Sequence, residues 1–392
     1  MSKIEDLIKQ YCPDGVEYKK LGELGTFYGG ITGKSKADFE NGNAKFISYK
    51  NVYSNFVVDQ STSDRVMIGE NENQRSLQYG DICFTGSSET PDECGFSSVV
   101  TSVPSEPLYL NSFSFFFRFH DLSGINPEYM KYLFRSSDLR YQIGKTANGV
   151  TRFNVSKELM KSVIIPIPHI AVQDEIVRIL DKFTELEKEL EKELELRRKQ
   201  YEWYRDKLLT FDGGGRRKKV SEITNVLRGK RLTKTQLSEE GKFSVFHGGL
   251  EPLGKYDSFN RKANTVMIIN VGASAGTVGY CKEDFWSSDG CFCLSATEEA
   301  EARYLYFVFQ SNEHYLISRV RKAGIPTLDA KVIEDMEIPV PSLQEQERIV
   351  KILDKFDTLT TDLTSGLPAE IKLRHQQYEY YRDYLFGLLR LE

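Results

Sequence analysis

The sequence IPIPHIAVQDEIVRILDKF (residues 165–183) returns later in the chain as IPVPSLQEQERIVKILDKF (residues 338–356). The two segments share 11 of 19 residues at a constant offset of 173 positions. A second pair follows them, because YEWYRD at 201–206 matches YEYYRD at 378–383 in five of six positions, at an offset of 177. This internal repeat decides the architecture, because each copy predicts one structural unit.

Each copy is expected to form a long helix. In the first copy, apolar residues recur at 176, 179, 183, 186, 190 and 194, and steps of three and four are typical of a coiled-coil seam. We predict a helix over 174–209, about 54 Å long at 1.5 Å per residue. The second copy holds four extra residues near Gly366 and Pro368. Because proline cannot donate to the helical ladder, we predict a kink or a short break there.

The segment before the first long helix is rich in predicted strands. Short apolar runs between Gly, Asn, Asp and Ser indicate strands at Phe46–Tyr49, Asp81–Phe84 and Ser112–Phe119. One helix is predicted over Pro127–Ile143, with Asn126 as its N-cap and the proline in its first turn.

The segment between the long helices repeats the first one more faintly. Tyr129–Phe134 matches Tyr304–Phe309, and Gly149-Val150 matches Gly324-Ile325. We therefore predict an α/β (α+β) fold with two globular domains and two long antiparallel helices. The predicted boundaries are 1–165 and 213–338 for the domains, and 166–212 and 339–392 for the helical spacers.

The beginning of the chain resembles the segment that follows the first long helix. Residues 7–21 share an apolar run, an Asp-Gly pair and a Lys-Lys pair with residues 208–220. The short helix predicted at Lys3–Gln10 would then continue the second long helix, as if the repeat closed into a ring. This predicts neighbouring termini and an approximate two-fold relation between the halves.

Composition favours a soluble cytoplasmic protein. The 392 residues are 40% hydrophobic and 28% charged, and no apolar run approaches the ~18 residues of a membrane span. The first residues lack the layout of a signal peptide, and six scattered cysteines suggest reduced thiols. The net charge is −5, but residues 213–338 carry 18 Lys and Arg against 16 Asp and Glu, which points weakly to a nucleic-acid partner.

None of the motifs that resemble catalytic sites meets the requirements of the site that it resembles. The run at 29–35 resembles a phosphate-binding loop, but that motif needs a glycine where Tyr28 stands. Asp14 and Glu17 lie on one turn, whereas metal-dependent nucleases take such carboxylates from separate strands. The Asn-Pro-Glu-Tyr run at 126–129 loosely resembles a motif of amino-methyltransferases, but it serves better as a helix cap. We therefore expect that this chain is not an enzyme.

Two further features are assigned no chemistry. Gly213–Gly215 is predicted to be a flexible linker. The histidines have no partner at metal-ligand spacing, and we expect no metal site from them; they stand at positions 120, 169, 247, 314 and 375.

The repeated motifs together resemble those of specificity (S) subunits of Type I restriction-modification systems. The resemblance lies in the Ile-Pro-x-Pro runs before Gln173 and Gln346, in the two Leu-Asp-Lys-Phe blocks, and in the Gln-Tyr-Glu-aromatic-Tyr-Arg-Asp runs. It covers the whole chain. The family's Glu-Gln pair is intact at Glu345-Gln346, while position 172 is valine in the first copy.

This resemblance implies a DNA-recognition role without catalysis. In that family each target-recognition domain reads one half of a bipartite sequence in double-stranded DNA. The helices set the gap between the halves and bind two methylation subunits, and restriction subunits join the complex. Those partner subunits would use S-adenosylmethionine, ATP and magnesium, while this chain binds no cofactor and contacts no membrane.

Candidate DNA-binding residues are polar or basic side chains near predicted turns, where they can reach phosphates or base edges. Lys50-Asn51 and Arg321-Lys322 stand out, because each pair follows an apolar run and precedes a turn or a glycine. An alternative function is a coiled-coil adaptor whose two domains bind proteins. The candidates are Lys34, Ser35, Lys36, Tyr49, Lys50, Asn51, Ser87, Ser88 and Arg152 in the first domain, and Arg231, Lys234, His247, Ser274, Arg321 and Lys322 in the second.

Overall fold

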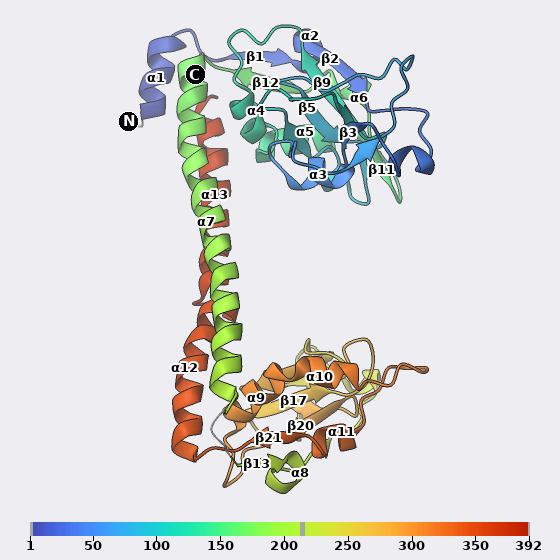
Figure 1. The fold of residues 1–392 in the computed structure, drawn as a ribbon. Helices are drawn as coiled ribbons and strands as arrows, with labels where there is room; N and C mark the ends of the chain where they lie inside the picture. The colour runs from blue at the N-terminus through green and yellow to red at the C-terminus, as the bar shows by residue number, and fades with distance from the viewer. Residues whose placement is uncertain (1–2, 212–215, 391–392) are drawn as a thin grey trace. The chain divides into compact units, whose positions relative to one another are not determined.

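The computed structural model describes residues 3–211 and 216–390. The chain divides into two compact units: Met1–Glu189 with Lys372–Glu392, and Leu190–Ile371. Each unit holds one globular domain and parts of the long helices (Figure 1). The predicted linker Gly213–Gly215 lies outside the described residues.

The first domain is organised around a four-stranded antiparallel sheet of order β2-β9-β5-β7. A second sheet, β4-β3-β8, contains the parallel pair β3–β8, and a third has the order β10-β11-β6. Pairing of β1 with β12 joins the beginning of the domain to its end. The strands are β1 (Glu17–Lys20), β2 (Gly25–Gly29), β3 (Ala44–Ile47), β4 (Arg65–Val66), β5 (Ile82–Thr85), β6 (Ser87–Ser88), β7 (Ser97–Val99), β8 (Leu108–Leu110), β9 (Ser114–Phe119), β10 (Ala147–Gly149), β11 (Phe153–Val155) and β12 (Ile164–Ile167).

The helix predicted over Pro127–Ile143 is two helices, so the prediction of one helix is wrong. The buried Ser136 hydroxyl donates to the Leu133 carbonyl at 2.7 Å, and such a local bond competes with the helical ladder. The predicted N-cap is confirmed, because the Asn126 side chain accepts from the Glu128 amide at 2.8 Å. The helices of this domain are α1 (Lys3–Tyr11), α2 (Leu21–Leu24), η1 (Lys36–Phe39), α3 (Tyr49–Ser54), η2 (Pro91–Glu93), α4 (Pro127–Leu133), α5 (Ser137–Gly144) and α6 (Lys157–Met160).

The second domain repeats three of the four sheets of the first, and isolated bridges at Thr327 stand where the first domain has the sheet β10-β11-β6. Its large sheet has the order β14-β20-β17-β18, its second sheet β16-β15-β19 contains the parallel pair β15–β19, and β13 pairs with β21. The faint sequence repeat between the domains therefore reflects a shared topology. The elements are β13 (Arg217–Lys219), α8 (Val220–Ile223), β14 (Leu227–Arg228), η3 (Lys234–Gln236), β15 (Phe243–Phe246), β16 (Gly254–Tyr256), β17 (Thr265–Ile269), β18 (Val278–Cys281), β19 (Trp286–Ser287), β20 (Cys291–Leu294), α9 (Ala302–Ser311), α10 (Glu313–Ser318), α11 (Ala330–Glu334) and β21 (Glu337–Pro339).

The first long helix, α7 (Ile170–Leu209), contains 40 residues. It begins four residues earlier than predicted, because the His169 carbonyl already accepts from the amides of Val172 and Gln173. No helix in the described part of the chain is both long and apolar enough to cross a lipid bilayer.

The second long helix is interrupted, as predicted, between α12 (Leu343–Thr361) and α13 (Leu367–Leu388). The Asp362 carboxylate accepts from the amides of Thr364 and Ser365 and so folds the chain into a turn. A Cβ atom at Gly366 would lie 2.4 Å from the Thr358 carbonyl oxygen, so the turn closes against α12 only with glycine.

The two long helices run in opposite directions in the first unit. Phe183 stacks on Tyr381 at 5.2 Å between ring centroids, and further along α7 the Glu187 carboxylate contacts His375 Nδ1 at 2.8 Å. As the residue numbers rise on α7, those on α13 fall, which confirms the antiparallel prediction there.

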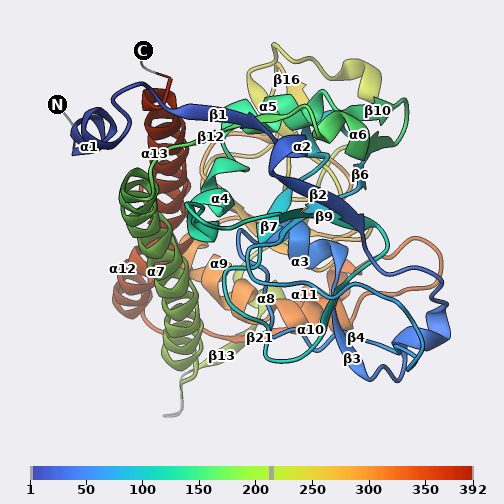
Figure 2. The same cartoon turned by 90° about the horizontal axis from the view of Figure 1, so that it is seen from above.

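Both ends of the described chain belong to the first unit. The buried Ile4 and Ile8 of α1 share a hydrophobic cluster with Leu385 and Leu388 of α13. Figures 1 and 2 show α1 beside the first turns of α7 and the last turns of α13. The prediction of neighbouring termini is confirmed for the described residues of this unit.

A buried carboxylate joins α1 to α7. Glu175 is 5% exposed, accepts from Lys3 Nζ at 2.8 Å and pairs with Arg178 at 2.6 Å. The hydrogen bond from Arg178, followed by that from Lys3, lowers the pKa of Glu175 to about 2, although burial opposes the shift.

We expect Glu175→Gln to weaken the first unit by about 1–2 kcal/mol at neutral pH. The effect is modest because Arg178 is half-exposed and Lys3 is more exposed, so solvent screens both cations. Because the folded pKa is depressed, this stabilisation is complete above the ordinary glutamate pKa and is lost as pH falls from about 4.3 towards about 2. Urea unfolding of both proteins between pH 7 and pH 2.5 measures it. A constant difference across that range would contradict the assignment.

Candidate nucleic-acid interface

One edge of the first domain collects side chains from three segments. Tyr49 begins α3 directly after β3, Ser87 lies in β6 just after β5, and Arg152 lies in the turn between β10 and β11. The Tyr49 hydroxyl donates to the Ser87 carbonyl at 2.7 Å, and Arg152 Nη2 donates to the Ser87 hydroxyl at 2.9 Å. Burial raises the pKa of Tyr49, so this hydroxyl stays a neutral donor. We name this surface the three-loop edge.

The second domain builds the same edge from equivalent segments. His247 follows β15, Ser274 lies in the turn after β17, and Arg321 lies in a hairpin in which it bridges Thr327. Thr327 in turn bridges Val271, which ties the hairpin to the Ser274 turn. His247 Nδ1 lies 3.3 Å from the Asp289 carboxylate. The structure thus brings predicted residues together on corresponding edges of both domains.

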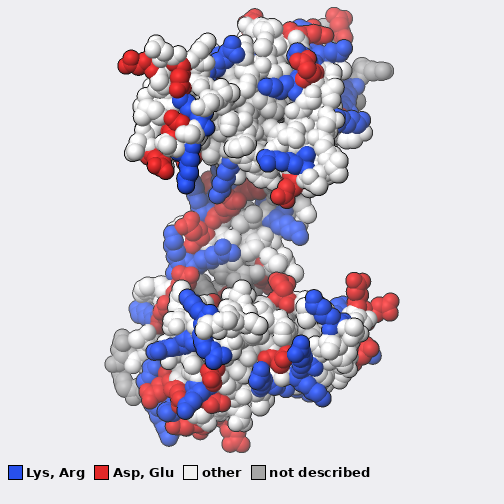
Figure 3. All heavy atoms as spheres, turned by 90° about the vertical axis from the view of Figure 1, so that its right-hand side faces the viewer, with Lys and Arg blue, Asp and Glu red and all other residues white. Residues whose placement is uncertain are grey.

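Exposed cations stand on both edges. Lys50 on α3 and Arg152 are exposed in the first domain, and Arg321 and Lys322 are exposed in the second. Figure 3 shows Lys and Arg side chains interspersed with Asp and Glu on the face that it draws. Cations at such edges can hold phosphates. Ser87 itself is only 7% exposed, so its hydroxyl positions Arg152.

Three predicted residues are held by contacts within the protein. Lys34 is 5% exposed at its side chain and pairs with Glu72. Ser35 caps η1. The side-chain amide of Asn51 donates from Nδ2 to the Asp59 carbonyl at 2.9 Å, and its Oδ1 accepts from the Asp59 backbone amide at 3.1 Å. The hydrogen-bonding atoms of the Asn51 side chain are therefore occupied.

The strand predicted over Phe46–Tyr49 is wrong at its C-terminal end. The strand stops at Ile47, and the Ser48 side chain accepts from the Asn51 amide and caps α3. The pair Lys50-Asn51 therefore opens a helix rather than a turn, because a serine N-cap outweighs the β-propensity of the tyrosine. The other two predicted strands are observed as β5 and β9 with small shifts of their ends.

The remaining candidates lie beside the two edges or apart from them. Ser88 donates to Glu93 next to Ser87, and Lys36 is exposed on η1. Arg231 and Lys234 are exposed on a segment that Lys230 ties to β19, since its amide donates to the Ser287 carbonyl. A DNA-binding role for these residues stays a prediction.

Two exposed aliphatic side chains at the hairpin tips were not among the candidates. Val150 is 91% exposed between β10 and β11, and Ile325 is 69% exposed at the equivalent hairpin. Each follows a glycine with positive φ, namely 154° at Gly149 and 79° at Gly324. The signal for them in the sequence is the match between Gly149-Val150 and Gly324-Ile325.

The long helices carry exposed aromatic side chains at corresponding positions. Trp203 is 55% exposed on α7 and Tyr380 is 66% exposed on α13. These are the aligned aromatic positions of the repeated YEWYRD and YEYYRD runs. Tyr384 stacks on Tyr380 at 6.3 Å, which extends the apolar surface on α13.

Within residues 3–211 and 216–390, no group of three or more His, Cys, Asp or Glu side chains is arranged to hold a metal ion. All six cysteines are free thiols, and burial raises the pKa of Cys291 to about 12. A thiol with such a pKa is protonated at neutral pH and is a poor nucleophile.

Comparison with known proteins gives one consistent answer. The family model described as "Type I restriction modification DNA specificity domain" matches residues 13–196 and 216–373. The specificity subunit of the type I restriction enzyme EcoR124I/EcoR124II of Escherichia coli is 35% identical over 266 residues, which are 61% of this chain and 66% of that protein. The match therefore spans slightly less than two thirds of that relative's length.

Solved structures share the fold at low sequence identity. The S subunit of a type I restriction-modification system from M. genitalium aligns with 96% of both chains, at a TM-score of 0.56 and 18% identity. A chain from a study of complex assembly in a type I restriction-modification system covers 95% of this chain and 98% of its own, at a TM-score of 0.62 and 17% identity. With the family model matched twice along its sequence, this chain belongs to the Type I restriction modification DNA specificity domain family.

Proposed function

We propose that this chain is the DNA-recognition subunit of a Type I restriction-modification complex, in which each domain reads one half of a bipartite target. The observation that carries the proposal is the duplicated three-loop edge. The same segments meet in both domains, but they carry Tyr49, Ser87 and Arg152 in one and His247, Ser274 and Arg321 in the other. One scaffold with two different sets of polar side chains suits the reading of two different half-sites.

The hairpins give each edge a shape that fits DNA. A two-stranded ribbon can enter the major groove. The β10–β11 hairpin would place Val150 near base edges, where an aliphatic side chain can contact a thymine methyl group, and would place Arg152 near the phosphates. In the second domain Ile325 would take the place of Val150, while Arg321 would reach a base edge.

Catalysis would be supplied by partner subunits. We propose that two methylation subunits bind the long helices, flip out an adenine and methylate it with S-adenosylmethionine, and that restriction subunits use ATP and magnesium. In this scheme the chain itself is non-catalytic and acts in the cytoplasm. The two long helices fix the gap between the half-sites, and α7 with 40 residues would measure about 60 Å.

Sequencing of modified bases tests the proposal. We expect a host that expresses this chain with its methylation partner to carry methylated adenine in one split motif of fixed gap. The same host with the partner alone serves as the control. Methylation without any split motif, or an identical pattern in the control, would contradict the proposal and favour an adaptor whose domains bind proteins.

The exposed aromatic residues of the long helices are expected to bind the methylation subunits. Trp and Tyr are enriched among the residues that dominate binding energy. We expect Trp203→Ala and Tyr380→Ala each to weaken partner binding about 10–100-fold, because both side chains are more than half exposed in this chain. Titration calorimetry with the purified methylation subunit measures the loss. Tyr141→Ala, a 64% exposed tyrosine on α5, is the matched control; an equal effect there would argue against a helix-specific surface.

A further inference from the structure

A completely buried glutamine sits at the same place in both repeats. Gln173 on α7 and Gln346 on α12 are each 0% exposed. They occupy aligned positions after the two Ile-Pro-x-Pro runs. A buried polar side chain must find hydrogen-bond partners inside the protein, so the partners show what each glutamine holds.

Gln173 joins three segments of the first unit. Its Oε1 accepts from the backbone amide of Asn126, the N-cap of α4, at 2.9 Å. Its Nε2 donates to the carbonyl of Gly124 at 2.7 Å and to the carbonyl of Pro168 at 2.8 Å. One side chain thus ties the start of the domain helix and the end of β12 to α7.

Gln346 makes the same three bonds in the second unit. Its Oε1 accepts from the amide of Glu301, the N-cap of α9, at 3.0 Å. Its Nε2 donates to the carbonyl of Glu299 at 2.8 Å and to the carbonyl of Pro341 at 3.0 Å. Only an amide side chain of this length offers one acceptor and two donors at these positions.

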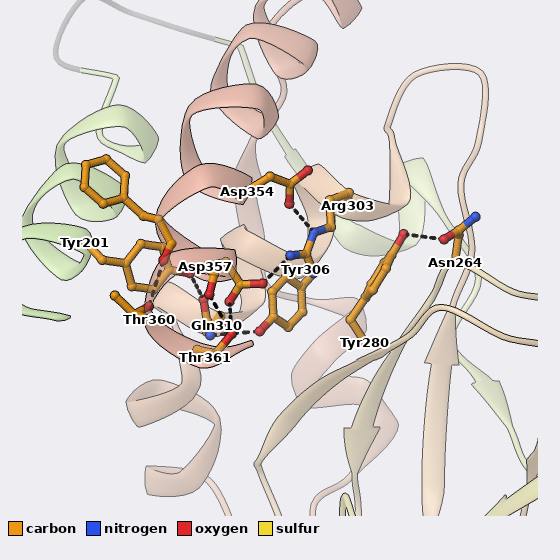
Figure 4. Close-up of polar contacts among 11 residues, drawn as sticks. Tyr201, Asn264, Tyr280, Arg303, Tyr306, Gln310, Asp354, Asp357, Thr360 and Thr361 are labelled. Carbon is orange, nitrogen blue, oxygen red and sulfur yellow. Dashed lines mark hydrogen bonds and ion pairs between the residues drawn. The ribbon is translucent and has the colours of Figure 1, made fainter. Parts of the chain in front are cut away.

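A second anchor lies eight residues further along each long helix. Asp181 accepts from Lys131 Nζ at 2.9 Å and from the Tyr132 hydroxyl at 2.6 Å, both on α4. Asp354 accepts from Arg303 Nε on α9 at 2.6 Å, and Figure 4 shows Arg303 also reaching Asp357. Eight helical residues span about 12 Å, so each domain helix is held at two separated points.

Two separated points of attachment fix the angle between a domain and its long helix, whereas a single point would let the domain rotate. We infer that Gln173 and Gln346 are positioning residues that hold each recognition domain at a fixed angle to its long helix and thereby restrict the target to a single gap length. The inference rests on the proposed function and adds a determinant of gap fidelity that acts without touching DNA.

The test compares gap tolerance in matched variants. Gln346→Met keeps the length of the side chain but removes all three bonds, whereas Gln344→Met makes the same change on the exposed face of α12. A plasmid library carries the native half-sites with gaps one base pair shorter, native and one base pair longer. We expect the preference for the native gap to fall about tenfold in Gln346→Met, with the bases of both half-sites unchanged and with no change in Gln344→Met.

A third variant separates positioning from stability. Val350→Ala removes buried packing from α12 and leaves both anchors in place, so it is expected to lower stability without broadening the gap. If Gln346→Met kept the native gap preference, or if Val350→Ala broadened it equally, the inference would be overturned. If the unmodified chain directed methylation to no split motif, the proposed function itself would be overturned, and the gap inference with it.

Hydrogen exchange gives a readout that needs no DNA or partner. The Glu301 amide is bonded to Gln346, so exchange in the peptide covering residues 299–305 should speed up at least tenfold in Gln346→Met and stay unchanged in Gln344→Met. Equal exchange in all three proteins would show that the glutamine does not hold this end of α9.

Discussion

An Arg303→Met variant should lose about 3–5 kcal/mol of unfolding free energy in the second unit. The Arg303 side chain is 10% exposed and pairs with Asp354 at 2.6 Å and with Asp357 at 2.5 Å. Burial lowers the pKa of this guanidinium, but the two carboxylates raise it more, and the net shift is upward. Removing the cation leaves Asp357, whose side chain is 13% exposed, buried without its partner.

Tryptophan fluorescence reports on this unit alone, since Trp203 and Trp286 are the only tryptophans in the chain. Urea unfolding followed by that signal measures the loss. A triple variant that adds Asp354→Asn and Asp357→Asn should recover much of the stability, because it removes the unpaired negative charges as well. If Arg303→Met lowered the free energy of unfolding by less than about 1 kcal/mol, the prediction would be wrong, because ordinary surface ion pairs contribute that much.

Alanine at Arg321 is expected to change recognition of one half-site only. A specific contact from arginine to a base contributes about 1–3 kcal/mol of discrimination, or roughly 10–100-fold. Methylation sequencing should therefore show relaxed bases in one half of the motif and an intact second half. Lys50→Ala should relax or weaken the other half. Lys255→Ala, an exposed lysine on β16, is the control in the second domain.

Equal relaxation of the base preference in both halves of the motif would contradict an independent role for each domain. If Arg321 contacted only a phosphate, binding would instead weaken uniformly and the salt dependence would become shallower. Measurement at two salt concentrations distinguishes base reading from phosphate binding.

The long helices could be predicted from the sequence because their signals are local. Apolar spacing at three and four residues and the Gly366–Pro368 insertion specify α7 and the break before α13. The division of Pro127–Ile143 into two helices could not be predicted in this way. It depends on a hydrogen bond of the buried Ser136, and burial is a property of the tertiary fold.

The candidate interface was predictable only in part for the same reason. Tyr49, Ser87 and Arg152 are far apart in the sequence, and the pairing of β6 with β11 brings them together. Lys34 and Asn51 had suitable side chains, but contacts with Glu72 and Asp59 occupy them. Val150 and Ile325 carry no polar group, so a pattern of polar and basic residues does not indicate the exposed hairpin tips that they occupy.

The first unit is completed by residues that follow the second domain in the sequence. Its hydrophobic cluster includes Tyr378, Phe386 and Leu388 of α13 together with Ile4 of α1 and Ile176 of α7. A ribosome synthesises these α13 residues only after the whole second domain has been made. The domain that is translated first therefore keeps part of its apolar surface open until α13 has been made, and a nascent chain that stops before residue 378 lacks the residues that close it.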